Sequence, residues 1–495
     1  MMTILPRTFR IALAAAAAAL LLDGCGGGGA DANSKARRMS VNSPAALAQA
    51  SADNYDDNVN GLVTGATLKR WMSNWAKERP AGVTGKLVIL QATAGPAGAE
   101  YIKPDGVQVF TYLSPSSEWI QTRNNGVIET PSMVPDGAMM DALLKKYNID
   151  PARDMIVAAM GTGSAPNAMA QGRIWYALRY WGVDKEHLAL LNGGNQWLVT
   201  SSMAAADFQA AASAAPNSGT ATVKDLMSDN TQLQATLRDL LAVLPAADSN
   251  VANDGVFIWD ARSVGQYAAG TLVERGEDTD SDTTGVQACA AAYCEPKNPN
   301  NYRWTFQNSG SRQGHPFGAL QLQYTYMLDS TKGFAYKPKA TLAAYLSGAP
   351  DASGIGLIDG TNKVVGAGNG YQEGDTIYTY CETTFRAMIT GITAGVILGK
   401  PTRFYDGAMV EWNSLSNIAD NSGRTILPAD SPWRTDLRSY FRPAMSSAEV
   451  APRNVGNAYA SQTDVIVNQD KGYKTGESVG TGGSTGLPPN PCGGG

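Results

Sequence analysis

Short apolar runs alternate along the chain with segments whose apolar residues recur at helical spacing. Apolar runs bounded by polar or glycine-rich turns are typical of buried strands, and spacings of three and four are typical of helices packed on a sheet. In the first 200 residues this pattern predicts helices at 136–149 and 172–183, strands at 85–93 and 153–161, and a strand with a Gly-Gly turn at 186–199. Strands that alternate with helices favour a parallel α/β sheet.

The same order recurs in the second half of the chain. The pattern there predicts helices at 338–348 and 385–400, strands at 254–263 and 374–381, and a strand with a turn at 401–412. Between the halves, an amphipathic stretch at 225–245 predicts a linker helix. We therefore predict an α/β protein with two related domains, each a mainly parallel sheet flanked by helices. The predicted boundaries are a targeting segment at 1–24, a flexible tether at 25–58, domains at 59–202 and 249–415, a linker at 203–248 and an irregular C-terminal extension at 416–495.

Length and charge agree with this division and narrow the class of partner. A chain of 495 residues is too long for one hydrophobic core, so more than one domain is expected. The net charge is −5, and no basic stripe with interleaved aromatic residues is present in the sequence. Nucleic acid is therefore not an expected partner. Small molecules or other proteins are the expected ones.

The N-terminal segment has the composition of an export signal. Arg7 and Arg10 precede an apolar stretch at 11–22, which at 1.5 Å per residue spans only about 18 Å and is too short to cross a bilayer. Basic, apolar and then small residues are typical of a secretory signal. The sequence that ends in Cys25, "LDGC", resembles a bacterial lipobox, although Asp23 departs from the usual small or aliphatic residue. We expect an exported lipoprotein anchored through Cys25, in the outer membrane or at the cell surface, with plain secretion as the alternative.

The cysteines outside the signal admit different interpretations. Cys289 and Cys294 lie close together in "ACAAAYCEP", and outside the cytoplasm a local disulfide between them is plausible. A zinc site is the competing interpretation, but it needs four ligands, and His187 and His315 are the only histidines in the chain. We expect no metal and no other cofactor.

A further cysteine stands at a predicted junction of strand and helix. The stretch "TIYTYCETTFRAMITG" alternates apolar and polar residues up to Cys381 and then continues at helical spacing. Backbone N–H groups at a helix start and the helix dipole favour negative charge, so a thiolate is stabilised in such a place. The alternative is a buried, inert thiol at a strand end. From the residues alone both interpretations remain open.

Several ordered motifs resemble those of one family, the tandem-domain rhodaneses, which are thiosulfate and 3-mercaptopyruvate sulfurtransferases. "RIWYALRYWGVDKEHLALLNGGNQWL" resembles the end of their first domain. "FIWDARSVGQY" resembles the D-x-R segment that opens the second domain, and "GHPFGAL" resembles its G-H-x-x-G-A motif. "YCETTFRAMITGITAGVILGKPTRFYDGAMVEW" resembles the catalytic loop, the following helix and the end of the second domain. The resemblance covers roughly residues 60–200 and 250–415.

The resemblance implies a persulfide carrier with its nucleophile in the second domain. It places the nucleophile at Cys381 and makes Arg386 available to brace the loop or to meet an anionic substrate. The residues expected around the substrate are Glu382, Thr383, Thr384, Phe385, Arg386, Ala387 and Gln266. In the first domain Met160 and Gly161 stand near the corresponding position, and neither forms a persulfide. The first domain is therefore expected to be non-catalytic.

Departures from the family pattern concern the substrate. Glu382 and Thr383 stand where the thiosulfate type has basic residues, and Gln266 stands where the family usually offers an arginine. Thr384 replaces the glycine of the mercaptopyruvate type, and because glycine adopts positive φ without strain, we expect a changed loop shape. Two cations are lost and a carboxylate is gained, which argues against thiosulfate as the natural donor.

The other motif residues are interpreted as structural. We expect His315 to order its loop and Asp260 to form an ion pair with Arg262, and we interpret Asp406 and Glu411 as structural as well. Two long insertions interrupt the second domain, at 271–310 and 349–374. Long loops in compact domains are often functional, so either insertion is a candidate lid or a candidate site for a protein partner.

The leading hypothesis is a sulfurtransferase that carries sulfur on Cys381 from a small sulfur-containing anion to a thiol or cyanide-like acceptor. A variant of it keeps the thiol chemistry and takes another oxyanion such as selenite. The contrasting hypothesis is a non-enzymatic surface lipoprotein that uses the rhodanese scaffold for protein interaction. Retention of Cys381 favours chemistry, because a decayed site is free to lose its nucleophile.

Overall fold

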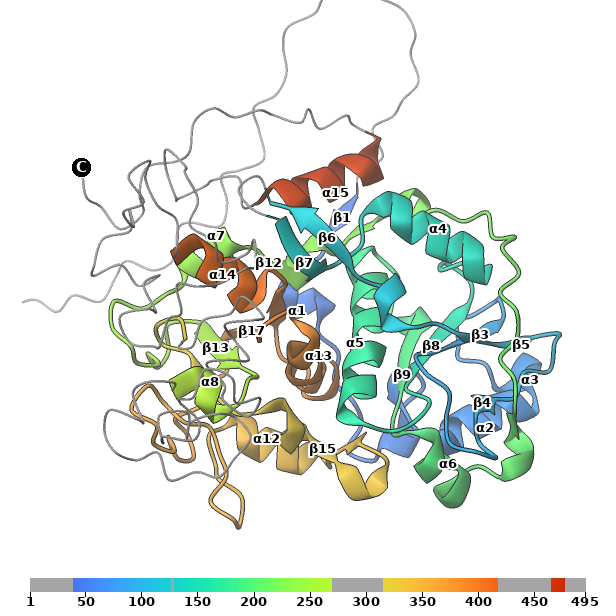
Figure 1. Ribbon diagram of the computed structural model, residues 1–495, viewed down its shortest axis with the longest axis horizontal. Coiled ribbons are helices and arrows are strands. Elements are labelled where there is room, and N and C mark those ends of the chain that lie inside the picture. The colour runs from blue at the N-terminus through green and yellow to red at the C-terminus, as the bar shows by residue number, and fades with distance from the viewer. Residues whose placement is uncertain (1–38, 126–128, 269–314, 417–463, 477–495) are drawn as a thin grey trace, which may run out of the picture. The chain divides into compact units, whose positions relative to one another are not determined.

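A computed structural model describes residues 39–125, 129–268, 315–416 and 464–476, in which two five-stranded parallel sheets form the centre of the fold (Figure 1). The first sheet has the order β2 (Gly61–Val63), β9 (Leu188–Leu191), β8 (Met155–Ala159), β3 (Leu87–Gln91) and β5 (Val109–Leu113). The second has the order β12 (Gln234–Ala235), β18 (Thr402–Tyr405), β17 (Thr376–Tyr380), β13 (Val256–Asp260) and β14 (Leu320–Gln321). Neighbouring strands in both sheets are parallel. The two orders correspond strand for strand, so the predicted fold class is confirmed.

Helices and two-stranded β-pairs complete both halves. The first half contains α2 (Gly65–Ser73), α3 (Trp75–Glu78), α4 (Gly137–Tyr147), α5 (Ala165–Tyr180) and α6 (Asn195–Ser201). The second contains α7 (Leu237–Ala242), α8 (Val264–Ala268), α12 (Lys339–Leu346), α13 (Phe385–Ile392), the π-helical turn η10 (Thr393–Ile397) and α14 (Ala408–Ser416). Two-stranded pairs join β4 (Tyr101–Ile102) to β10 (Phe208–Gln209), β6 (Gln121–Asn124) to β7 (Glu129–Met133), and β15 (Leu328–Asp329) to β16 (Ala335–Tyr336). Within the described residues, no helix is both long enough and apolar enough to span a bilayer.

One apolar core is shared by the two halves. Helix α5 packs on β8 and β9, α13 packs on β17 and β18, and the two helices contact each other (Figure 1). Their approach is close at Gly172, where an added Cβ would lie 2.5 Å from the Cβ of Met388. Buried residues of both halves, such as Leu90 and Phe404, belong to the same cluster. The outer faces of the two sheets carry separate clusters.

Helix α5 begins well before the predicted start at 172. Its N-terminus is set by Ser164, whose hydroxyl accepts a hydrogen bond from the N–H of Asn167, and Pro166 stands in the first turn. Most of the helix is buried on all sides, since it lies against both the first sheet and α13. The first turn is the exception, because Pro166 is exposed and Asn167 and Met169 are half-buried, and its proline and asparagine are more typical of a loop.

Three predicted segments differ from the structure. The linker helix at 225–245 is wrong. The segment there forms β11 (Ser228–Asp229), β12 and the short helix α7, which begins at Thr236 with a capping box to Asp239. Strand β12 pairs with β18, so the second domain begins within the predicted linker. The segments 186–199 and 401–412 each continue past their turn into a helix, α6 and α14 respectively.

Residues 39–58, predicted as part of a flexible tether, are ordered. They form β1 (Ser40–Val41), which pairs with β11, and α1 (Pro44–Leu47). The N–H groups of Gln49 and Ser51 then donate to the carbonyls of Gly395 and Ile397, at 2.8 and 3.1 Å. These carbonyls belong to the π-helical turn, where helical partners are lacking. The N-terminal segment is thus fixed to the second half by backbone hydrogen bonds.

The C-terminal extension, predicted as irregular, contains α15 (Val465–Thr475). Asp470 of this helix accepts two hydrogen bonds from Arg123, at 2.7 and 2.8 Å, and one from the hydroxyl of Tyr180, at 2.7 Å. The Nζ atom of Lys474 donates to the carbonyl of Trp181 at 2.9 Å. Polar contacts therefore anchor the helix, and its sequence shows little apolar patterning.

Of the two predicted insertions, the structure describes the one at 349–374. Within the insertion at 349–374, Ile358 pairs with Gln321 in β14 through N–H···O bonds of 2.9 and 3.0 Å. The insertion thereby covers an edge of the second sheet, which would otherwise expose unpaired backbone groups. The insertion at 271–310, with Cys289 and Cys294, lies outside the described residues, as do the targeting segment and Cys25.

Candidate active site

Cys381 directly follows β17, the central strand of the second sheet, and its side chain is fully buried. It packs with Ala261 and Ala387, and the half-buried Tyr324 lies against this small cluster. Strand β13 ends beside it, since the N–H of Ala261 donates to the carbonyl of Tyr380 at 3.0 Å. The thiol therefore lies at the carboxyl edge of the parallel sheet, where ligand sites of open α/β folds occur.

The backbone after Cys381 is held by the start of α14. The carbonyls of Cys381 and Glu382 accept hydrogen bonds from the N–H groups of Met409 and Val410, at 3.0 and 3.2 Å. Both carbonyls are thus directed at α14 and away from the following helix. The loop from 381 to 384 then leads into α13, whose N-terminus lies one short turn from the thiol.

The N-cap of α13 does not use its own side chain to cap the helix. Thr384 makes no side-chain hydrogen bond to the first turn, and its hydroxyl donates instead to the carbonyl of Asp406 at 2.8 Å and lies 3.3 Å from that of Tyr405. The first N–H groups of an α-helix have no partner within the helix. Thr384 therefore leaves these groups of α13 to other partners, and the helix dipole favours negative charge at this N-terminus.

Thr384 adopts the left-handed conformation that glycine would adopt without strain. Its φ is 64°, so the replacement of glycine at this position does not remove the positive φ from the loop. A β-branched residue in this region costs about 1–2 kcal/mol. The two carbonyl contacts of the Thr384 hydroxyl offset part of this cost and give the threonine a structural reason to stand there.

The D-x-R segment forms the buried ion pair that the sequence predicts. The guanidinium of Arg262 contacts the carboxylate of Asp260 at 2.6, 3.0 and 3.1 Å, and both side chains are fully buried. The hydroxyl of Tyr380 also donates to Asp260, at 2.9 Å. This pair lies at the end of β13, directly beside the end of β17. The two opposite charges therefore lie next to the start of the loop that carries Cys381.

A chain of polar side chains connects Glu382 to Arg386. The Nε2 group of Gln266 donates to Glu382 at 3.3 Å, and the Oε1 atom of Gln266 accepts from Arg386 and from the hydroxyl of Ser263. Nη1 of Arg262 lies 3.6 Å from the carboxylate of Glu382. Gln266 thus bridges Glu382, directly after Cys381, and Arg386, in the first turn of α13.

Burial changes the acidity of two groups in the site. The pKa of Glu382 is raised because its carboxylate is buried, although Arg262 and Arg386 act in the opposite direction. The pKa of Tyr324 is raised, again mainly by burial, with Arg386 opposing the shift and Cys381 adding to it. Tyr324 also packs against the small cluster that contains the thiol.

The first half has the corresponding strand arrangement but no cysteine at the corresponding position. Met160 directly follows β8, which corresponds to β17, so it stands at the position of Cys381. Gln91 occupies the position of Asp260 at the end of β3, and it donates to the carbonyls of Thr93 and Glu100. A thioether and an amide replace the thiol and the carboxylate, in agreement with a first half that carries no nucleophile at this place.

The first half contributes a buried cation beside the loop. Nη1 of Arg173, on α5, donates to Asp406 at 2.7 Å, and both side chains are fully buried. The other oxygen of Asp406 accepts the N–H of Val134 at 2.7 Å. The Arg173 guanidinium also lies 5.9 Å from the centre of the Phe385 ring, in the first turn of α13. Asp406 therefore connects the first half, through Arg173 and Val134, to the loop, through Thr384.

The structure brings most of the predicted site residues together. Glu382, Gln266 and Arg386 form one network beside Cys381, and Ala387 packs against the thiol. Phe385 and Thr383 are half-exposed at the rim. His315 lies apart from this network: its ring contacts the carboxylate of Asp248 and the carbonyl of Tyr267, which fits a loop-ordering role.

Sequence reasoning missed two contributors to the site. Tyr324 follows the two-residue strand β14, and its position depends on a backbone hydrogen bond to Ala261 that no local pattern signals. Arg173 lies in a helix of the other half, and only the packing of α5 on α13 brings it to the loop. Its one sequence signal is a cation in an otherwise apolar helical stretch, "GRIWYAL".

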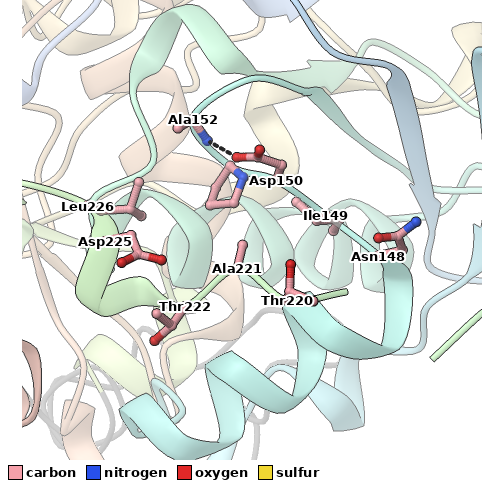
Figure 2. Close-up of a pocket in the computed structure, with 10 residues that line it drawn as sticks. Asn148, Ile149, Asp150, Ala152, Thr220, Ala221, Thr222, Asp225 and Leu226 are labelled. Carbon is pink, nitrogen blue, oxygen red and sulfur yellow. Dashed lines mark hydrogen bonds between the residues drawn. The ribbon is translucent and has the colours of Figure 1, made fainter. Parts of the chain in front are cut away.

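Hollows elsewhere on the described surface do not involve the thiol. A polar hollow of about 240 Å³ lies between the loop after α4 and residues 220–226, lined by Asp150, Thr222 and their neighbours (Figure 2). A second hollow, of about 370 Å³, is lined by Arg123, Asp136 and Asp470. In the parts of the chain that the structure describes, no three His, Cys, Asp or Glu side chains gather as a metal-binding group.

Comparison with known proteins gives similarity of structure only. No family model matches the sequence, and no curated protein matches it. Among solved structures, Tum1 from Saccharomyces cerevisiae aligns over 72% of this chain and 95% of its own, with 14% identity and a TM-score of 0.43. SseA from Escherichia coli, a 3-mercaptopyruvate sulfotransferase described with the "Rhodanese" fold, aligns over 70% and 98%, with 14% identity and a TM-score of 0.41.

An anaerobic ergothioneine biosynthesis enzyme from Chlorobium limicola aligns over 71% of this chain and 68% of its own, with 13% identity and a TM-score of 0.44. The solved structures that are similar to this chain thus include a protein described with the "Rhodanese" fold.

Proposed function

We propose that the protein is a sulfurtransferase in which Cys381 carries the transferred sulfur as a persulfide. The observation that carries the proposal is the position of the thiol, at the end of the central strand β17 and beside the uncapped N-terminus of α13. The carbonyls of Cys381 and Glu382 are bound by N–H groups of α14, and Thr384 makes no side-chain hydrogen bond to the first turn of α13, which supports a site where N–H donors can serve an anion. A persulfide carrier needs this environment, because its sulfur is anionic before the reaction and after it.

The proposed reaction has two half-reactions. The Cys381 thiolate attacks the outer sulfur of a donor, the bond between that sulfur and the rest of the donor breaks, and the leaving group departs with the electron pair. The persulfide anion that forms then lies at the first turn of α13. An acceptor nucleophile, such as a thiol or cyanide, attacks the outer sulfur and releases the Cys381 thiolate, so no external oxidant or reductant is required.

Access to the thiol requires local movement. Cys381 is fully buried, whereas Tyr324 beside it and Arg386 at the end of the loop are only half-buried. A donor therefore reaches the sulfur by displacing these side chains. Arg386 is hydrogen-bonded to Gln266, which also accepts from Ser263, so a donor that displaces Arg386 breaks this contact while the pair of Asp260 and Arg262 stays in place.

The test is a pair of half-reactions on the purified protein. Intact mass is measured after exposure to thiosulfate, 3-mercaptopyruvate or a small organic persulfide, and again after addition of cyanide, with thiocyanate measured in parallel. We expect a mass gain of one sulfur that is discharged by cyanide and is absent from Cys381→Ser. If no donor loads the wild-type protein, or if Cys381→Ser is loaded equally, the proposal is wrong and a scaffold role is favoured.

A further inference from the structure

Threonines at the helix N-caps of this protein differ in what their hydroxyls bind. Thr64 and Thr236 begin α2 and α7 with extended backbone, at φ of −93° and −84°, and their hydroxyls accept hydrogen bonds from N–H groups of the first turn at 3.4 and 3.2 Å. Capping of this kind uses an N-cap residue in the extended region. Thr384 begins α13 at a φ of 64°, and its hydroxyl makes no bond to the first turn. The left-handed conformation of Thr384 therefore separates its side chain from the helix that it begins.

The first turn of α13 lies against the thiol. Ala387, the third residue of this helix, packs with Cys381 in one small buried cluster. In the part of the chain that the structure describes, the N–H groups of Phe385, Arg386 and Ala387 have no hydrogen-bond partner. Such N–H groups and the positive end of the helix dipole favour an anionic sulfur beside them. The uncapped turn is thus suited to the persulfide that is proposed for Cys381.

A hydrogen bond to Asp406 holds Thr384 in this conformation. The Thr384 hydroxyl donates to the carbonyl of Asp406 at 2.8 Å, and the threonine is fully buried. The carboxylate of Asp406 is in turn bound by Nη1 of Arg173 and by the N–H of Val134, each at 2.7 Å. Both of these donors belong to the first half, so the acceptor of the Thr384 hydroxyl is fixed from outside the second sheet. A β-branched residue adopts positive φ only where such contacts offset the strain.

We propose that Thr384 is a positioning residue for sulfur transfer and acts through its hydroxyl. The bond to Asp406 keeps residue 384 in the left-handed conformation, and this conformation holds the first turn of α13 against Cys381 with its N–H groups uncapped. The inference rests on the proposed persulfide at Cys381. Thr384 takes no part in bonds to sulfur, and the first half of the protein, through Arg173 and Val134, fixes the residue to which it binds.

Substitutions at position 384 separate the hydroxyl from the conformation. Thr384→Val keeps the β-branch but removes the hydroxyl, Thr384→Ser keeps the hydroxyl, and Thr384→Gly adopts positive φ without it. The loading rate is measured by intact mass, with Cys381→Ser as the blank, at increasing concentrations of the donor that loads the wild type fastest among thiosulfate, 3-mercaptopyruvate and the persulfide of 2-mercaptoethanol. We expect Thr384→Val to load about tenfold more slowly at saturating donor, which corresponds to the loss of one hydrogen bond to a charged group. The half-saturating concentration should not change, and Thr384→Ser and Thr384→Gly should load at close to the wild-type rate.

Thr402→Val is the matched control for the loss of a buried hydroxyl. Thr402 is buried at the start of β18, and its hydroxyl donates to the carbonyl of Lys400 at 2.9 Å. This variant loses a similar hydrogen bond at the other end of the strand from Asp406, so it should lose a similar amount of stability in urea and keep the wild-type loading rate. If Thr384→Val does not fold, Thr384→Ala removes the same hydroxyl with a smaller side chain and takes its place in the comparison.

The outcomes are distinct for the two proposals. Equal loading rates of Thr384→Val and the wild type overturn the positioning role, and so does a Thr384→Gly variant that loads as slowly as Thr384→Val. A loss of rate in Thr402→Val as large as that in Thr384→Val also overturns it, because lost stability is then the cause. In all three cases sulfur transfer to Cys381 stands. If none of the donors loads the wild type at Cys381, both proposals are wrong.

Discussion

The buried ion pair between Arg173 and Asp406 joins the two halves of the protein, and its removal has a calculable cost. Asp406→Asn keeps one acceptor oxygen but removes the charge that faces Arg173 at 2.7 Å. Among the described residues, Nε and Nη2 of Arg173 have no hydrogen-bond partner, so Asp406 is the main compensation for this cation. Both side chains are fully buried, and an arginine does not give up its proton at accessible pH.

The expected loss of stability follows from these contacts. Removing one partner of a buried pair costs about 3–5 kcal/mol, because the remaining charge stays in a medium of low polarity. The amide can satisfy either Val134 or Arg173 with its one oxygen, whereas the carboxylate now satisfies both. We therefore expect Asp406→Asn to lower the free energy of unfolding by about 4 kcal/mol, a large part of the usual 5–15 kcal/mol.

Urea-induced unfolding followed by tryptophan fluorescence measures this loss. Arg173→Met combined with Asp406→Asn should recover most of it, because the double variant leaves no unpaired buried charge at this place. Asp53→Asn, at a carboxylate that is 96% exposed, serves as the control and should change stability by less than about 0.5 kcal/mol. The reasoning is refuted if Asp406→Asn lies within about 1 kcal/mol of the wild type, or if the double variant is as unstable as the single one.

Two further predictions concern other buried groups. Burial raises the pKa of Glu411 from 4.5 to about 7, so the folded protein binds a proton at this carboxyl more tightly than the unfolded chain does. The stability that the bound proton contributes is full below pH 4.5 and is lost as the pH rises to about 7. Glu411→Gln should therefore flatten the fall in unfolding free energy over that window, a change of about 3 kcal/mol at most, and an unaltered pH profile would contradict it. Gly391→Ala places a Cβ within 2.1 Å of the Phe404 ring, and this overpacking should cost about 1–3 kcal/mol of stability. The higher helix propensity of alanine should offset about 1 kcal/mol of that cost. The melting temperature should fall and should recover in part with Phe404→Leu, whereas an equal or higher melting temperature would show that the ring can move.

Much of the fold could be predicted from the sequence, because its central elements are strongly patterned. The apolar runs at 85–93, 153–161 and 374–381 coincide with β3, β8 and β17, and Cys381 lies at the predicted junction. What the sequence did not predict depends on tertiary contacts. Strand β12 has two residues and no measurable period, and it is a strand only because β18 lies beside it.

The candidate site also has a part that the sequence predicts and a part that depends on tertiary contacts. Its contiguous part, from Cys381 to Ala387, could be assigned from the motif, and so could the ion pair of the D-x-R segment. The burial of Glu382, its contact with Arg262 and the bridge through Gln266 depend on the pairing of β13 with β17, which no local pattern specifies. The docking of α15 was missed for a related reason, since it relies on Arg123 and Asp470, residues that pattern analysis places at the surface.

The hydrogen bonds of the N-terminal segment to the π-helical turn have a consequence for folding during synthesis. The hydroxyl of Ser51 donates to the carbonyl of Val396, a residue 345 positions later in the chain. At about 5–20 residues per second, a ribosome takes on the order of tens of seconds to make the intervening chain. During that time the first sheet can form, but the segment from 49 to 51 has no backbone partners for these groups. The native arrangement of residues 49–51 is therefore completed only after the second half has been synthesised, and the shared core, which contains Leu47 and Phe404 together, closes as a late step.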